Sequence, residues 1–458
     1  KKQLIEGNII HSKTKTELEV IENGIIAVNE KGKIEWIGTK EDFKKSKVAT
    51  TYENVEEKLN FTSNSKFICP GFVDTHTHAP QFPNSGIGLD MELLAWLEKY
   101  TFPTESKYAD IAYATKQYQK VVKAHARAGT TTCVYFATIH TDAAIALAKI
   151  IQEVGQRAFI GKVNMDRNSP DFYIEKSAEA SLTETKRFIE GIKGMNDDTL
   201  QPMITPRFVP TCTPELMKGL AELAKEHQLA IQSHISENLG EIAWVKELHP
   251  ETKHYADAYD QFGLLTKKTV MAHGIFMLTE ELELFAKRGT TISHCPNSNF
   301  SLKSGILNIR RAMDAGVHVA LGTDVSGGYS PSMLDAIRQT MIASRATYFA
   351  HRDIVDVDAE VRSVLEGKFP DESKCPPLLS FDEVFYLATL AGAEAVGLNE
   401  TTGNFKVGKD FDALFVDLND LPHDPEKDSL KDKLQRFLLC GDDRQIVNMM
   451  VKGKSLSF

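Results

Sequence analysis

Two histidines lie two residues apart at the end of an apolar segment of the sequence. They are His76 and His78, and they close the run Phe67-Ile-Cys-Pro-Gly-Phe-Val-Asp-Thr-His-Thr-His. Side chains alternate along a β-strand, so residues two apart point to the same side. Both imidazoles can therefore reach one metal ion. The pair alone is weak evidence, because two such histidines also occur in ordinary structural roles.

Three further side chains that can bind a metal stand at the ends of short apolar segments. They are His234, His273 and Asp324. If these segments are strands of a β/α barrel, their carboxyl ends converge on the face where such barrels carry their catalytic residues. That convergence makes a purely structural explanation of the whole set the weaker one. The sequence therefore predicts a metal site.

The types of the side chains indicate which metal and which chemistry to expect. Neutral imidazoles with one carboxylate, and without paired thiolates, suit Zn²⁺ in a catalytic site that keeps an open position for water. Iron or another divalent ion stays an alternative, because affinity order alone does not select among them. Zinc lowers the pKa of its bound water from about 15.7 to about 7, which provides hydroxide at neutral pH. We expect a hydrolytic reaction.

Glu237 is the candidate for the group that moves protons. It follows His234 by three residues in Ser233-His-Ile-Ser-Glu, so it can enter the same cavity from the loop after the strand. On its own, this spacing equally fits a surface or helix-capping glutamate. After a predicted ligand at a strand end, we interpret Glu237 as a proton shuttle, and Asp324 can share the task as a base.

The elements that must position these residues alternate between short strands and amphipathic helices from Phe67 onward, which indicates a parallel β/α architecture. We expect a (β/α)8 barrel over residues 68–398. Its eight strands are predicted to end near His76, Phe136, Asn164, Arg207, His234, His273, His294 and Asp324. Helices are predicted at Pro214–His227, Thr279–Lys287, Pro331–Tyr348 and Phe381–Val396.

Both ends of the chain have a different pattern. Short β-rich pieces at 25–28, 34–38, 412–417 and 447–452 predict a small β-sandwich domain built from residues 1–67 and 399–458 together. Residues 40–66 are polar and lack periodicity, so we expect a loop there.

Composition excludes several classes of function. The 458 residues carry a formal net charge of −10, so no overall positive field attracts nucleic acid or an anionic membrane surface. Six widely spaced cysteines predict free thiols and a reducing compartment. With no membrane-spanning run and no apolar leader at the start of the sequence, we expect a cytoplasmic protein.

The motifs together resemble the amidohydrolase superfamily. The residues that carry the resemblance are Pro70-Gly-Phe-Val-Asp-Thr-His-Thr-His, Ser233-His-Ile-Ser-Glu, Ala272-His and Gly322-Thr-Asp. The resemblance implies one zinc ion per subunit, held by His76, His78, His234 and Asp324. It places His273 near the attacking water or the substrate, with a catalytic role. Members with two metals carry a modified lysine on the fourth strand, where this sequence has Arg207.

Further segments resemble the members of that superfamily that deaminate guanine. They are Ala79-Pro-Gln, Ile204-Thr-Pro-Arg-Phe and Ser293-His-Cys-Pro-Asn-Ser-Asn, together with Gly322 to Ser330 and Gly441-Asp-Asp-Arg. The resemblance implies that Gln81 and Arg207 bind the edge of a purine and that Phe208 packs against its ring. It also implies a homodimer that converts guanine to xanthine and ammonia in purine catabolism. The alternatives are another amino- or chloro-substituted heterocycle as substrate, or an inactive scaffold.

Overall fold

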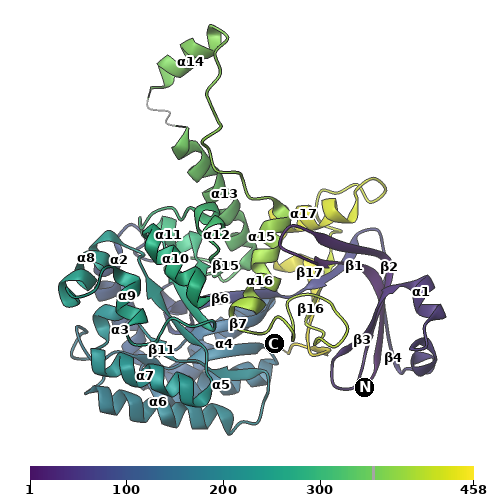
Figure 1. The fold of residues 1–458 in the computed structure, drawn as a ribbon. Helices are drawn as coiled ribbons and strands as arrows, with labels where there is room; N and C mark the ends of the chain where they lie inside the picture. The colour runs from purple at the N-terminus through teal and green to yellow at the C-terminus, as the bar shows by residue number, and fades with distance from the viewer. Residues whose placement is uncertain (353–355, 458) are drawn as a thin grey trace.

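The computed structural model describes residues 1–352 and 356–457 and shows an α/β protein with parallel strands. Strands from the two ends of the chain lie side by side in one eight-stranded sheet (Figure 1). Its order is β18-β17-β16-β5-β1-β2-β3, with β4 paired to β1. The strands are β1 (Gln3–Ser12), β2 (Leu18–Val28), β3 (Ile34–Thr39), β4 (Glu57–Phe61), β5 (Lys66–Pro70), β16 (Ala413–Asp417), β17 (Ile446–Val451) and β18 (Lys454–Ser455). The predicted sharing of one β-region by both termini is thus present, and its folding as a sandwich stays a prediction.

Residues 40–66 do not form the expected loop. They contain α1 (Lys40–Lys45), the 3-10 turn η1 (Ala49–Tyr52) and β4. The Thr39 side chain accepts a hydrogen bond from the Asp42 backbone and so caps α1. The Phe43 ring of α1 packs edge-on against Trp36, and β4 pairs in parallel with β1. These tertiary contacts order a segment whose own sequence carries little periodicity.

The parallel strands of the central region pair in three groups. Their orders are β10-β8-β7-β6, β11-β9 and β12-β13-β14-β15. The strands are β6 (Phe72–His78), β7 (Thr130–Phe136), β8 (Arg157–Gly161), β9 (Val163–Asn164), β10 (Leu200–Pro202), β11 (Thr205–Pro206), β12 (Ile231–Ile235), β13 (Thr269–His273), β14 (Thr291–His294) and β15 (His318–Leu321). The predicted strand ends at Phe136, Asn164, His273 and His294 coincide with observed ends.

Backbone contacts connect the groups. Ile204 forms a parallel bridge with Ile231, which links the segment between β10 and β11 to β12. After β15, the Asp324 amide donates to the carbonyl of His76 over 2.8 Å, and the His78 amide donates to the carbonyl of Val325 over 2.9 Å. The first and last strands of the region therefore meet at the end where the candidate site residues stand.

The helices lie between and outside these strands, as Figure 1 shows. Before β13 they are α2 (Leu93–Trp96), α3 (Phe102–Ser106), α4 (Ile111–Arg127), α5 (Thr141–Val154), α6 (Ala178–Lys193), α7 (Pro214–His227), α8 (Leu239–Leu248) and α9 (Tyr255–Asp260). After β13 they are α10 (Thr279–Arg288), α11 (Pro296–Ser301), α12 (Ile309–Asp314), α13 (Met333–His351), α14 (Val357–Leu365), α15 (Phe381–Ala388), α16 (Leu390–Ala395) and α17 (Leu430–Cys440). Short turns include η2 (Ala79–Asn84) and the π-helical η3 (Leu97–Thr101).

Local signals explain where two of the predicted helices begin and end. Helix α7 has the predicted bounds, because the Thr213 side chain caps it and Pro214 occupies its first turn. The helix predicted over Phe381–Val396 is instead interrupted at Thr389, whose hydroxyl donates to the carbonyl of Phe385. Such a side-chain bond competes with the regular helical ladder.

A helical arm projects from the body of the protein. Helix α13 leads away from the strands, and α14 lies at the far end (Figure 1). Of the described residues, none in α14 is buried. Among all helices of the described ranges, none is both long and apolar enough to cross a bilayer.

Candidate active site

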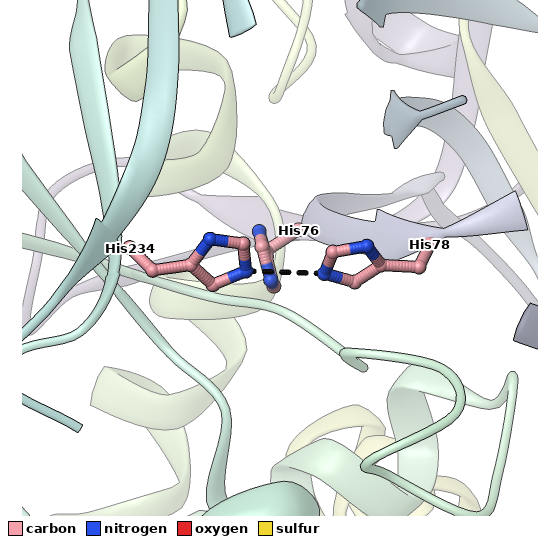
Figure 2. A group of neighbouring side chains, drawn as sticks. All are labelled: His76, His78 and His234. Carbon is pink, nitrogen blue, oxygen red and sulfur yellow. Dashed lines mark hydrogen bonds between the residues drawn. The ribbon is translucent and has the colours of Figure 1, made fainter. Parts of the chain in front are cut away.

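A cluster of imidazoles stands at the carboxyl ends of the parallel strands. Figure 2 shows His76 and His78 of β6 converging with His234 of β12. The Nε2 atoms of His78 and His234 lie 3.1 Å apart. Asp324 follows β15, and its Oδ1 lies 3.1 Å from His76 Nε2 and 3.4 Å from His78 Nε2. The predicted orientation of His76 and His78 toward one centre is therefore present.

Hydrogen bonds behind the cluster set the direction of its rings. His234 Nδ1 donates to the backbone carbonyl of Arg207 over 2.6 Å, so its Nε2 lone pair points to His78. His273 Nδ1 donates to Asn299 Oδ1 over 2.9 Å. Partners of this kind fix the tautomer and orientation of imidazoles that bind metals.

The cluster fits a divalent metal ion. Possible ligand atoms lie within 4.8 Å of one another in two overlapping groups, which are His76, His78, His234 and His76, His273, Asp324. Burial holds the pKa of His78 and of His234 well below its usual range, so both rings are neutral. Two neutral imidazoles with facing nitrogen atoms, next to a carboxylate, match the ligands that zinc prefers.

A second group of possible ligands lies deeper, at Asp74, His125 and Cys133. Two of its three side chains already have other partners. Asp74 accepts from the amide and hydroxyl of Thr323, and His125 contacts the hydroxyl of Thr77. We interpret this group as part of the core beneath the site.

Two carboxyl groups beside the cluster have pKa values displaced in opposite directions. Burial raises the pKa of Glu237 well above its usual range, and the negative charge of Asp324 adds to the effect. Burial opposes ionisation of Asp324 as well, but the neighbouring His76 and His273 hold its pKa below its usual range. Glu237 Oε2 lies 3.2 Å from His273 Nε2, and Ser304 donates to Glu237 Oε1. Such a pair supplies one acid and one base at neutral pH.

The opposite side of the pocket carries hydrogen-bond donors. Gln81 of η2 and Arg207, which follows β11, are both buried and both line the cavity. A third residue, Glu105 of α3, accepts from Gln81 Nε2 over 2.9 Å and from Arg207 Nη1 over 2.7 Å. Although burial opposes the charge of Arg207, Glu105 raises the pKa of this guanidinium. The cation therefore stays charged inside the protein.

The cavity between the two sides, counted with its opening to solvent, has a volume of about 430 Å³. Its apolar wall is formed by Leu93, Trp96, Leu97, Phe208 and Leu302. A flat heterocycle with polar edges suits such a space, because aromatic side chains cover its faces and a few placed polar groups contact its rim.

Residues 67–362 and 374–456 match the amidohydrolase family. The chain belongs to this family. It is 42% identical to a guanine deaminase of Dictyostelium discoideum, over 100% of this chain and 98% of that protein. It is also 42% identical to the guanine deaminase of Rattus norvegicus, over 99% and 96% of the two chains. A crystal structure of the guanine deaminase from C. acetobutylicum, with guanine bound in its active site, is 36% identical with a TM-score of 0.88 and covers 100% of both chains.

In this amidohydrolase, the residues that the sequence singles out meet in one pocket. The pocket is lined by His78, Gln81, Arg207, Phe208, His234, Glu237, His273 and Asp324, and His76 contacts Asp324 directly. Their chemical roles remain predictions.

Residues in and around the amidohydrolase pocket to which the motifs assign no role also support the site. Glu105 joins the two predicted substrate-binding residues, Asn299 orients His273, and Ser304 contacts Glu237. Trp96 forms part of the apolar wall. None of these residues stands at a strand end, so the spacing that marks the histidines does not mark them.

Proposed function

We propose that this amidohydrolase hydrolyses guanine to xanthine and ammonia in purine catabolism. The observation that carries this proposal is a single pocket with two complementary sides. One side joins a cluster of possible metal ligands to Glu237, a carboxyl group with a raised pKa, and the other presents the buried donors Gln81 and Arg207. The full-length similarity to guanine deaminases, including a guanine-bound structure, supports the same substrate here.

One zinc ion per subunit would be held by His76, His78, His234 and Asp324. The proximity of His76, His78 and His234, the distances from Asp324 Oδ1 to His76 and His78, and the neutral state of His78 and His234 support this set. When bound, zinc lowers the pKa of water to about 7 and so supplies a hydroxide nucleophile at neutral pH. The metal content of purified protein tests the stoichiometry, with one equivalent expected.

Glu237 and Asp324 divide the proton transfers. Glu237 accepts one proton from the water that becomes the hydroxide and relays it to the ring nitrogen beside the carbon that bears the amino group, which makes that carbon electrophilic. Asp324 takes the remaining water proton and passes it to the amino group, which leaves as ammonia while the carbonyl of xanthine forms.

Substrate binding falls to the other side of the pocket. Gln81 and Arg207 donate hydrogen bonds to the purine edge, and Phe208 packs against the ring. His273, whose Nε2 lies 3.2 Å from Glu237 and 3.6 Å from Asp324, stands beside both carboxyl groups, where it contacts the attacking water or the substrate.

The decisive experiment compares substrates on the zinc-loaded protein. Guanine, adenine, cytosine and a chlorotriazine are supplied separately, and ammonia release and ultraviolet absorbance are followed. We expect rapid turnover of guanine alone. Turnover of another compound would keep the hydrolytic reaction but reject the roles of Gln81 and Arg207. No turnover by metal-loaded protein would favour an inactive scaffold.

We also propose that the parallel strands close into a (β/α)8 barrel over residues 68–398, beside a composite β-domain from residues 1–67 and 399–458. The bridge between Ile204 and Ile231 and the backbone bonds from Asp324 to His76 support closure. The shared sheet of the two termini supports the composite domain. Limited proteolysis tests the division, because cleavage should leave 68–398 as a resistant unit.

A homodimer is the assembly that we propose. Support comes from α14, where Val357, Val361, Val364 and Leu365 form one exposed apolar stripe at helical spacing. Sedimentation velocity should show a dimer that Val361→Asp with Leu365→Asp dissociates. Phe172→Asp, at an exposed apolar residue elsewhere, serves as the matched control.

All six cysteines are free thiols, which supports a reducing compartment such as the cytoplasm.

A further inference from the structure

Glu105 is a carboxylate that lies behind the pocket wall. It belongs to α3, and none of its surface is exposed. Its side chain accepts hydrogen bonds from Gln81 Nε2 at 2.9 Å, Arg207 Nη1 at 2.7 Å, Arg207 Nη2 at 3.1 Å and Tyr173 Oη at 2.6 Å. An ionised carboxylate accepts about four hydrogen bonds and donates none. The donors around Glu105 therefore fill its capacity.

These bonds determine what Gln81 presents to the cavity. Its Nε2 donates one hydrogen to Glu105, and its Oε1 accepts from the Ser326 amide over 3.2 Å. The amide is thus held from both ends and cannot exchange its oxygen and nitrogen without losing both contacts. The remaining hydrogen on Nε2 is available as a donor to a ligand.

Arg207 is held in the same way. Two of its terminal nitrogen atoms bind Glu105 as a fork, and the guanidinium lies 5.0 Å from the ring centre of Phe102 in the same helix as Glu105. A guanidinium has five N–H groups and no acceptor. The fork uses two of them, and Nη1 also donates to Met165 Sδ over 3.7 Å. The remaining two N–H groups are available as donors, and Arg207 lines the cavity.

We propose that Glu105 is a positioning residue that makes this side of the pocket a pure donor surface and thereby sets its preference for a 6-oxo purine. This inference rests on the proposed function. Guanine offers acceptors at its O6 and N7 atoms, whereas adenine offers an amino donor at position 6. A site built to pair buried polar groups discriminates strongly against ligands that leave them unpaired. Glu105 acts through Gln81 and Arg207 and does not touch the substrate.

The test compares two probes that differ in the 6-oxo group and in the N1 proton that accompanies it. Hypoxanthine carries the 6-oxo group and purine does not, and the dissociation constants of both are measured by calorimetry. We expect the wild-type protein to prefer hypoxanthine, and Glu105→Gln to reduce that preference about tenfold or more, because the loss of a hydrogen bond to a charged group has an effect of this order. For guanine turnover, Glu105→Gln should raise KM more than it lowers kcat.

Glu383→Gln is the matched control, because the buried Glu383 forms another fork with an arginine, the partly buried Arg310, away from the pocket. It should leave the preference unchanged. Tyr173→Phe removes one donor to Glu105 and keeps the carboxylate, so it should shift the preference in the same direction by a smaller factor. If Glu105→Gln does not fold, the binding preference of Tyr173→Phe decides whether Glu105 is a positioning residue.

Equal weakening of both probes by Glu105→Gln, or an unchanged ratio, would overturn the inference and leave Glu105 a structural role. The test of Glu105 and the test of guanine deamination can fail independently of each other. Failure of the wild-type protein to deaminate guanine rejects the function, while the binding ratio still decides the role of Glu105.

Discussion

The candidate pocket has two sides that are held by different parts of the molecule. His76, His78 and His234 stand on strands whose backbones are bonded to neighbouring parallel strands. Gln81 stands on the short helix η2 and Arg207 follows β11, and the two are joined through the carboxylate of Glu105 on the short helix α3. The side that carries His76, His78 and His234, called the strand side below, is supported by backbone pairing. The side that carries Gln81 and Arg207, called the recognition side below, is supported by side-chain hydrogen bonds. Substitutions on the recognition side should therefore change affinity and selectivity and leave metal binding intact.

His234→Ala should have the largest effect. It removes one imidazole from the proposed ligand set, and without metal the pKa of water returns from about 7 toward 15.7, so turnover of guanine should fall by at least about 10⁴-fold. Metal content and ammonia release are measured together. His227→Ala, at the end of α7 and outside the pocket, is the control. A variant that kept its zinc and its activity would exclude His234 as a ligand.

Glu237→Gln should separate proton transfer from metal binding within the strand side. The amide keeps the shape of the side chain but cannot relay protons, so kcat should fall by about 10²- to 10⁴-fold. Zinc content and hypoxanthine affinity should stay near wild-type values. Glu222→Gln, at an exposed position on α7, controls for loss of a carboxylate. Near-normal turnover would show that another group moves the protons.

Arg207→Lys tests the independence of the two sides directly. Lysine cannot form the fork with Glu105, so kcat/KM for guanine should fall by about 10- to 100-fold, as expected for a hydrogen bond between charged groups. The backbone carbonyl of residue 207, which orients His234, is still present in the variant. Zinc content should therefore not change, and loss of zinc would show that the two sides are coupled.

The same contrast explains how much the sequence reveals. His76 and His78 are visible because the strand period of two places them on one side, and His273 is visible because it ends an apolar segment. Glu105 is not visible, because its partners are separated from it by 24 and 102 residues and no periodicity connects them. Local patterns predict strand-borne residues well, whereas a shared buried carboxylate depends on packing that only the folded chain shows.

The fold shows the same limit. Helix α7 is predicted with its observed bounds because Thr213 and Pro214 mark its start within the helix's own sequence. Strand β4 is missed because it is ordered by parallel pairing with β1, more than fifty residues earlier in the chain. The closure that we propose for the central strands likewise rests on contacts between their first and last members, such as the bond from Asp324 to His76.

Asn299→Ala should have the smallest effect of these substitutions. It tests whether the strand side also depends on side-chain hydrogen bonds. Asn299 accepts from His273 Nδ1 over 2.9 Å, which orients the ring so that Nε2 faces Glu237. Loss of such an orienting partner typically costs ten- to a hundredfold, and we expect about tenfold in kcat here, because the strand backbone still holds His273. Asn297→Ala is the matched control, since the side chain of Asn297 has no hydrogen-bond partner among the described residues. A fall as large as that of Glu237→Gln would show that His273 is positioned by its side-chain partner rather than by β13, and the division between the two sides would no longer hold.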